Sequence, residues 1–324
     1  MSFPKILAVG GAHIDRRGRI TGAYVPGASN PGVMAEDVGG GAFNALRNAV
    51  RRGARGAIMS VRGGDAAGET VARAIARAGI ADLSAIFLDR TTPSYTALLD
   101  RESDVIAALA DMALYEIAFA KQLRRASFRA AAAEADALLC DANLPADALA
   151  RLAAVAAGKP LFAIAISPAK VARLSESLET LSCLFMNFRE AARLGGLSDD
   201  ASVDEIVARL RSMGLSSAVI SHGGASTVAF DRSEIFSIMP PRPRKIADVT
   251  GAGDALAGVT TVALLRGLPL GEALREGMAA AMLAVESQAS VPEFSAGGFT
   301  AALALVPKAE ALHQGGRIGE TNDA

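Results

Sequence analysis

Short apolar runs alternate along this chain with longer segments that carry apolar residues at helical spacing. The short runs are typical of buried strands and lie at residues 5–10, 57–61, 137–140, 161–166, 183–186 and 218–221, followed by a β pair through Val228 and Ile238. The longer segments predict helices at residues 42–52, 69–78, 146–157, 189–194, 203–213 and 251–266. Strands that alternate with helices predict a parallel sheet that is covered on both faces. The expected fold class is therefore α/β, a three-layer, doubly wound, mostly parallel sheet.

Two polar segments with strand character interrupt this alternation, at about residues 16–38 and 92–112. The first is rich in Gly and Pro and has β-prone pieces around Ile20 and Tyr24–Val25. In the second, apolar residues alternate with polar ones on either side of a polar loop at 100–104, as in a hairpin with one exposed face. Together the two insertions predict a small β lid, which could exclude water from an active site.

Composition and charge narrow the class of protein. Of the 324 residues, 51% are hydrophobic, and the net charge is −1 without any Lys/Arg run, which disfavours nucleic acid as a partner. Cys140 and Cys183 both lie in apolar runs, as reduced core thiols of a cytoplasmic protein do. We find no signal peptide and no apolar stretch of the ~20 residues that a membrane span needs. We expect one domain over residues 1–312 and a loose polar tail over 313–324.

The segment from Asp248 to Asp254 carries the clearest chemical signal. Its three small residues stand at the N-terminus of an apolar helix, where unpaired backbone N–H groups form an anion pocket, and they are Gly251, Ala252 and Gly253. Asp254 follows in the first turn, where the helix terminus is expected to lower its pKa. An anion hole beside a carboxylate suits phosphoryl transfer to a hydroxyl group. The same Asp can instead simply stabilise the helix by about 0.3–1 kcal/mol, so this motif alone leaves both interpretations open.

Two further polar motifs follow predicted strands. Asp15 lies just beyond the first strand, where open α/β sheets bind ligands, and the neighbouring His13 is expected to be packed or hydrogen-bonded rather than catalytic. Gly40 and Gly41 open the next helix and would let a ligand approach the backbone, with Asn44 in the first turn facing the same place. The dinucleotide fingerprint Gly-x-Gly-x-x-Gly and the P-loop motif are both absent from the sequence. A Rossmann dehydrogenase and a P-loop enzyme are therefore disfavoured.

Taken in chain order, four motifs resemble the ribokinase-like (PfkB) carbohydrate kinase family. Gly39–Asn44 resembles the first signature of this family, and Asp248–Asp254 resembles the second. The turn Gly64–Gly68 and the pattern Asn187-x-x-Glu190 are similar to two further family motifs. The resemblance extends over nearly the whole chain and implies an ATP-dependent phosphotransferase with an alcohol group as acceptor.

The resemblance also implies roles for individual residues around the substrate. Asp254 would activate the sugar 5′-hydroxyl, and the anion hole would be formed by Gly251, Ala252 and Gly253. The ribose hydroxyls would be held by Asp15, Gly40, Gly41 and Asn44. This arrangement is chemically sensible, since a carboxylate accepts from two vicinal hydroxyls while an amide both donates and accepts.

For the nucleotide and the metal ions, the resemblance implies a second set of residues. ATP would be contacted by Asn187, Ser221, Gly223 and Gly253. Glu190 would position Mg²⁺ through water, as is common for an ion that keeps several waters. A monovalent cation, expected to be K⁺, would be bound by Asp248 and Thr250.

Within the family, several stretches are most similar to the pseudouridine kinases, namely Ser29–Gly32, Thr92–Asp100 and Leu109–Met112. This likeness implies transfer of the γ-phosphoryl group of ATP to the ribose 5′-hydroxyl of pseudouridine. The base would be contacted by Asn30, Thr92 and Ser94, and a homodimer is expected through the lid. The alternatives are a kinase for inosine, adenosine or a free sugar, and a catalytically weak nucleoside or sugar sensor on the same fold.

Four positions depart from the family pattern. Leu46 and Val259 replace small residues in the two signatures, and Ser226 replaces a second glycine of the nucleotide loop. Ile164–Ala165 occupies the place of an acidic residue and a proline in pseudouridine kinases. The last departure bears on substrate choice, and none of the four removes Asp254.

Overall fold

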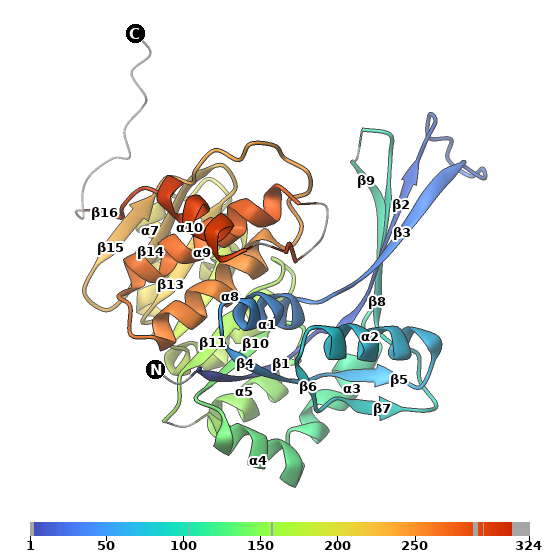
Figure 1. The fold of residues 1–324 in the computed structure, drawn as a ribbon, viewed down its shortest axis with the longest axis horizontal. Helices are drawn as coiled ribbons and strands as arrows, with labels where there is room; N and C mark the ends of the chain where they lie inside the picture. Colours follow the sequence, from blue (N-terminus) through green and yellow to red (C-terminus); the bar gives the residue numbers. More distant parts are fainter. Residues whose placement is uncertain (1–2, 103, 157, 288–290, 294, 313–324) are drawn as a thin grey trace.

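A large, mostly parallel sheet forms the centre of the computed structural model, which describes residues 3–102, 104–156, 158–287, 291–293 and 295–312 (Figure 1). Its ten strands run in the order β16-β15-β14-β13-β12-β11-β10-β1-β4-β6. The parallel strands are β1 (Lys5–Val9), β4 (Arg55–Met59), β6 (Ala81–Asp82), β10 (Ala137–Asp141), β11 (Leu161–Ile164), β12 (Cys183–Asn187) and β13 (Ala218–His222). The antiparallel edge consists of β14 (Ala225–Phe230), β15 (Ile235–Ile238) and β16 (Glu310–Ala311).

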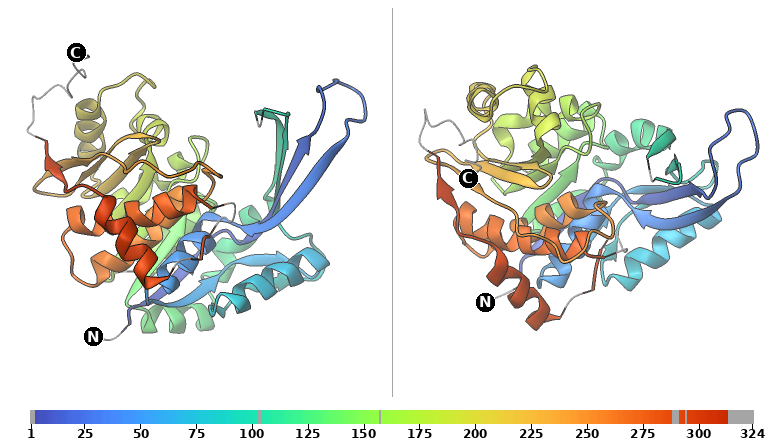
Figure 2. Two further views of the ribbon diagram at one scale, coloured as in Figure 1. Left: turned by 45° about the horizontal axis from the view of Figure 1, so that its top comes forward. Right: turned by 90° about the horizontal axis from the view of Figure 1, so that it is seen from above.

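Helices cover both faces of this sheet (Figures 1 and 2). One face packs against α1 (Gly41–Arg51), α2 (Ala66–Arg77), α8 (Ala252–Leu265), α9 (Leu270–Val285) and α10 (Ala296–Leu305). The other packs against α3 (Ala113–Gln122), α4 (Ala126–Glu134), α5 (Ala146–Val155), the 3₁₀ segment η1 (Val171–Thr180), α6 (Phe188–Gly195) and α7 (Val203–Ser212). Side chains alternate along β1, so that Ile6 and Ala8 enter one core and Leu7 and Val9 enter the other. The predicted three-layer α/β fold is confirmed.

A four-stranded sheet leaves this body as an arm (Figures 1 and 2). It has the order β3-β2-β8-β9, with β2 (His13–Ile20), β3 (Gly32–Gly39), β8 (Ser94–Leu99) and β9 (Val105–Asp111). This sheet is the predicted lid, although β2 begins before residue 16. The strand piece predicted at Tyr24–Val25 is wrong, because these residues lie in the turn-rich loop between β2 and β3.

A separate two-stranded sheet, β5 (Val61–Gly63) with β7 (Ala85–Phe87), lies beside the body. Cys140 and Cys183 are both buried and free, as expected for core thiols. No helix in the described part of the chain is long and apolar enough to span a membrane. The tail predicted at residues 313–324 lies outside the described residues.

Candidate active site

The residues predicted to hold the ribose lie where the strand order of the sheet changes direction. β1 pairs with β4 on one side and β10 on the other, which creates a crevice at the carboxyl ends of β1 and β10. Asp141, the last residue of β10, is fully buried there. Its Oδ2 accepts from the backbone N–H groups of Gly11, at 3.0 Å, and Ala42, at 2.8 Å. Asp141 thus fixes the start of α1 against the turn after β1.

One of the glycines predicted to contact the substrate, Gly40, is required by a close approach of two backbone segments. Gly40 has φ 112°, and a Cβ there would lie 2.2 Å from the carbonyl oxygen of Gly11. A Cβ on Gly41 would lie 2.2 Å from Cδ1 of Ile166. Packing explains Gly40, whereas the neighbour of Gly41 is the end of a flexible side chain. Contact of either glycine with a ligand stays a prediction.

Asp254 lies at the centre of a hydrogen-bonded network that joins α1 to α8. Asn44 Nδ2 donates to Asp254 Oδ2 at 2.9 Å. Arg47, one turn along α1, donates through Nη2 to Asn44 Oδ1 and, at 3.0 Å, to the carbonyl oxygen of Val38. The Asn44 amide therefore contacts the candidate base directly, while Arg47 fixes its orientation.

The pKa of Asp254 differs from the sequence-based expectation. Its pKa is raised from 3.8 to about 7, mainly by burial and to a lesser extent by the carboxylates of Asp141 and Asp15. The hydrogen bond from Asn44 and the charge of Arg47 act in the opposite direction but do not compensate. The prediction that the helix terminus lowers the pKa of Asp254 is wrong, because desolvation outweighs the helix dipole at this position. A carboxylate with a pKa near 7 is well suited to act as a general base at neutral pH.

The segment predicted to form the anion hole starts a helix, and the N–H of Ala252 donates to the carbonyl oxygen of Val249 at 3.4 Å. α8 begins at Ala252, and Gly251 before it takes the left-handed conformation, with φ 80°. The N–H groups of Gly253 and Asp254 belong to the first helical turn, where intrahelical acceptors are lacking. Gly253 is exposed, so a ligand can reach this terminus.

The residues expected to bind a monovalent cation are engaged differently. Asp248 Oδ2 forms an ion pair with Arg17 on β2, and Asp248 Oδ1 accepts from the backbone N–H of Thr250 at 2.8 Å. Asp248 does neutralise a positive charge, but that charge is an arginine side chain. The sequence analysis missed this contact, because residues 17 and 248 come from distant segments.

Asp15 lies beside the same crevice, as predicted. Its Oδ1 is 3.2 Å from His13 Nε2, and the His13 Nδ1 is 3.1 Å from the hydroxyl of Tyr115. The Tyr115 hydroxyl also accepts from the backbone N–H of Ala12 at 3.0 Å. His13 is thus buried and hydrogen-bonded, as expected, and it holds Asp15 in place.

The three residues predicted to contact a base are placed less favourably. The amide of Asn30 is occupied within the lid-tip loop by Val25 and Ala28. Thr92 is buried, and its hydroxyl and N–H both donate to Asp65. Asn30 and Thr92 therefore have structural roles that the sequence analysis did not recognise.

Strand register identifies the lid face that lies toward the crevice. Ser94 pairs with Ile14, whereas Tyr95 pairs with Asp15. Because paired residues share a face and neighbours alternate, Ser94 points to the face opposite Asp15. Tyr95 shares the face of Asp15, as does Asp37 on the neighbouring strand β3.

The predicted nucleotide residues come together at the ends of β12 and β13. Asn187 and Glu190 form a capping box at the start of α6, with Asn187 Oδ1 accepting from Glu190 N at 2.9 Å and Glu190 Oε2 accepting from Asn187 N at 2.7 Å. Ser221 pairs with Asn187 in the parallel register. Gly223 follows in the β13–β14 turn with φ 58°.

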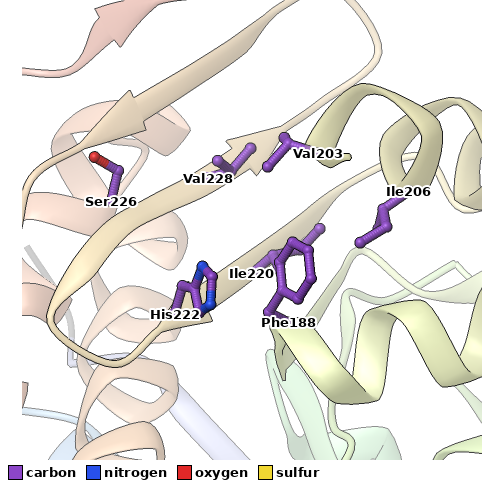
Figure 3. Close-up of a pocket in the computed structure, with 7 residues that line it drawn as sticks. All are labelled: Phe188, Val203, Ile206, Ile220, His222, Ser226 and Val228. Carbon is purple, nitrogen blue, oxygen red and sulfur yellow. The ribbon is translucent and has the colours of Figure 1, made fainter. Parts of the chain in front are cut away.

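An aromatic pair borders this turn. The ring of His222 stacks on Phe188, with centroids 4.5 Å apart and planes inclined by 12° (Figure 3). Together with Ser226 and Val228, these rings line a small pocket next to the nucleotide residues. Ser226, one of the departures from the family pattern, thus lies at the rim of this region.

Four important residues were missed by the sequence analysis, namely Arg17, Arg47, Tyr115 and Asp141. A signal existed for Asp141, since it directly follows a predicted buried strand at the ligand-binding edge. For the other three, the functional contact depends on the tertiary packing of lid and helices.

Comparison with known proteins defines the class of this one. Residues 4–293 match the model of the pfkB family carbohydrate kinases, so the chain belongs to the PfkB family of ATP-dependent kinases that phosphorylate a hydroxyl group of a sugar or nucleoside. Among its relatives, the pseudouridine kinase of Escherichia coli K12 is 27% identical over 312 residues, which cover 95% of this chain and 98% of that protein.

Two solved structures extend the comparison. A carbohydrate kinase from Agrobacterium tumefaciens is 46% identical, has a TM-score of 0.85 and is matched over 96% of this chain and 100% of that one. The ribokinase of Arabidopsis thaliana, solved with ribose and ATP, is 20% identical and shares the fold, with a TM-score of 0.81 over 94% of this chain and 99% of that one.

Proposed function

We propose that this protein is a nucleoside kinase that transfers the γ-phosphoryl group of ATP to the 5′-hydroxyl of pseudouridine. The observation that carries the proposal is the Asp254 carboxylate, with its pKa of about 7, next to the first-turn N–H groups of α8, which lack intrahelical acceptors. The similarity to a pseudouridine kinase supports the choice of substrate.

In this mechanism the ribose lies in the crevice between the lid and α1. Asp15 accepts from its hydroxyls, and Gly40 and Gly41 allow the close approach. The 5′-hydroxyl donates to Asp254. As its oxygen bonds to the γ-phosphorus, the proton passes to Asp254 and the bond to the bridging oxygen breaks, which releases ADP. The N–H groups of Gly251 and Gly253 stabilise the charge on the transferred group, whereas that of Ala252 donates to the carbonyl oxygen of Val249.

The residues at the end of β12 fit a role near a magnesium ion. The capping box uses Oε2 of Glu190 and Oδ1 of Asn187. Within the described part of the chain, Glu190 Oε1 and Asn187 Nδ2 take no protein hydrogen bond and remain able to bind water. When bound, Mg²⁺ neutralises phosphate charge, and the waters it keeps would be the groups that Glu190 holds.

Tyr95 is the residue that we expect to contact the nucleobase. Its side chain is half-buried on the lid face that carries Asp15, and aromatic rings stack on bases with about 1–3 kcal/mol per base. Tyr95→Ala should raise KM for nucleosides by about tenfold or more and leave KM for ribose unchanged. Tyr95→Phe, which keeps the ring, should behave as the wild type. An equal effect of Tyr95→Ala on ribose would exclude base stacking.

The lid also supplies the surface for the proposed homodimer. On the face opposite Asp15 and Arg17, large apolar side chains remain exposed: Met34 by 56%, Leu98 by 41% and Leu109 by 69%. Exposed apolar patches on folded proteins commonly mark interfaces. We expect Leu109→Asp to convert a dimer into a monomer, as measured by light scattering after gel filtration.

The matched control for this experiment is Leu305→Asp. Leu305 is 60% exposed on α10, away from the lid, so the same change of charge there should leave the dimer intact. A monomeric wild type at micromolar concentration would contradict the proposal, as would a dimeric Leu109→Asp variant.

The substrate itself is tested by measuring ATP consumption with Mg²⁺ and pseudouridine, uridine, inosine, adenosine or ribose as acceptor. Preference for pseudouridine supports the proposal. Preference for another acceptor would support the proposed kinase activity but contradict pseudouridine as the substrate. Ligand binding without turnover on all five would instead favour a sensor on this fold.

A further inference from the structure

The ion pair between Arg17 and Asp248 connects the lid to the loop that precedes the anion hole. Arg17 lies on β2, and Asp248 lies three residues before Gly251. Both carboxylate oxygens of Asp248 are engaged, Oδ2 by Arg17 and Oδ1 by the Thr250 N–H. Although burial raises its pKa, the hydrogen bonds from Thr250 and Arg17 hold the pKa of Asp248 below its usual range.

The positive charge of Arg17 beside Asp248 affects how the start of α8 can bind phosphate. The N–H groups that follow at the start of α8 are placed to receive phosphate oxygens. An unpaired carboxylate on the loop that leads to them would repel those oxygens, since like charges in a partly buried site are poorly screened. Pairing Asp248 with a cation removes this repulsion.

The same loop is held from the other side by α9. The backbone N–H groups of Ala247 and Asp248 donate to the carbonyl oxygen of Val285 at 2.8 and 3.3 Å. Arg17 holds the loop from the lid side through its ion pair with Asp248. It stands two residues after Asp15 on the same strand face, so the strand that faces the sugar also carries the charge that stabilises the loop.

We propose that Arg17 is the built-in cation of this site and that nucleotide binding consequently does not depend on K⁺. The expected K⁺ ligands do not fit a monovalent ion in this arrangement, because a guanidinium occupies Asp248 Oδ2. This role of Arg17 concerns the binding of ATP. It rests on the proposed nucleoside kinase activity only where phosphorylation of pseudouridine is measured.

The test measures the Kd for ATP by calorimetry, and the Tm, in KCl and in choline chloride of equal ionic strength. The wild type should bind ATP in both salts with Kd values within about twofold of each other. Arg17→Met should bind ATP about tenfold or more weakly in choline chloride, because the unpaired Asp248 carboxylate repels the phosphate oxygens, and should recover in KCl as K⁺ takes the freed carboxylate. Its Tm should also rise with K⁺.

Arg19→Met is the matched control. Arg19 lies on the same strand and face but is exposed, and within the described residues it forms no ion pair. This variant should therefore respond to K⁺ as the wild type does. Arg17→Lys, which keeps a positive charge, should remain insensitive to K⁺ and provides the comparison if Arg17→Met does not fold.

A wild type whose ATP affinity falls tenfold or more in choline chloride would overturn the inference. So would an Arg17→Met variant whose Kd and Tm are no more sensitive to K⁺ than those of Arg19→Met. Intact ATP binding without phosphorylation of pseudouridine would contradict the proposed substrate and leave the role of Arg17 standing.

Discussion

Replacing Asp254 by Asn should reduce kcat by a factor of about 10² to 10⁴ and leave the Kd for ATP and for the nucleoside nearly unchanged. Asn keeps the size of the side chain and can still contact Asn44, but it cannot accept the proton of the 5′-hydroxyl. Steady-state kinetics combined with calorimetric titrations measure the two quantities separately. A variant with wild-type turnover would remove Asp254 from the mechanism.

The same variant should be more stable than the wild type at pH 8. Folding raises the pKa of Asp254 from 3.8 to about 7, so the folded state holds a proton that the unfolded state has lost at intermediate pH. Stability from this group is complete below pH 3.8 and is lost as the pH rises through 7. Thermal unfolding should therefore show a higher Tm for Asp254→Asn at pH 8, with the difference shrinking toward pH 4. A constant difference across this range would indicate that the pKa is not raised.

The pH dependence of kcat/KM should follow the ionisation of Asp254. Because the base must be deprotonated, activity should fall about tenfold per pH unit below a midpoint near 7. Arg47 carries the positive charge that stabilises the ionised form, since burial lowers its own pKa only to about 10. Arg47→Met should move the midpoint to higher pH by about one unit. In this variant Asp141 and Asp15 still raise the pKa of Asp254, and of the two groups that lower it only Asn44 remains.

Two variants separate the charge of Arg47 from its effect on packing. Arg47→Lys keeps the charge and should retain a midpoint near that of the wild type. Arg51→Met removes a charge one turn further along α1, where the guanidinium donates to the carbonyl oxygen of Val291 at 2.9 Å, and should not shift the profile. If the midpoint is the same in Arg47→Met and the wild type, Arg47 only positions Asn44.

The central sheet could be predicted because its strands are short apolar runs. The spacing of apolar residues distinguishes such strands from the helices between them. Gly251 and Asp254 were also predictable, since a helix terminus is a local feature that needs only the neighbouring sequence. The helices α9 and α10 were not predicted, and neither were α3 and α4. The sequences of α3 and α4 are apolar on most sides, and the amphipathic period that indicates a helix is weak there.

The contacts that adjust the site chemistry could not be predicted in the same way. The pKa of Asp254 depends on Asp141 and Arg47, which lie far from it in the chain. Arg47 approaches it through the packing of α1 against α8, and Asp141 approaches it from the end of β10. Likewise, Tyr95 rather than Ser94 faces the crevice because of the register between β8 and β2. A shift of one residue in a strand exchanges its two faces, and sequence alone does not determine register in a short lid strand.

The most direct test of the central claim is to identify the product that the wild type forms from ATP and pseudouridine. Phosphorus NMR of the purified product should show one phosphate ester coupled to the two C5′ protons, and Asp254→Asn should form this product at a rate lower by orders of magnitude. Phosphate on the 2′ or 3′ oxygen, or no nucleotide product in spite of bound ATP and pseudouridine, would contradict the account.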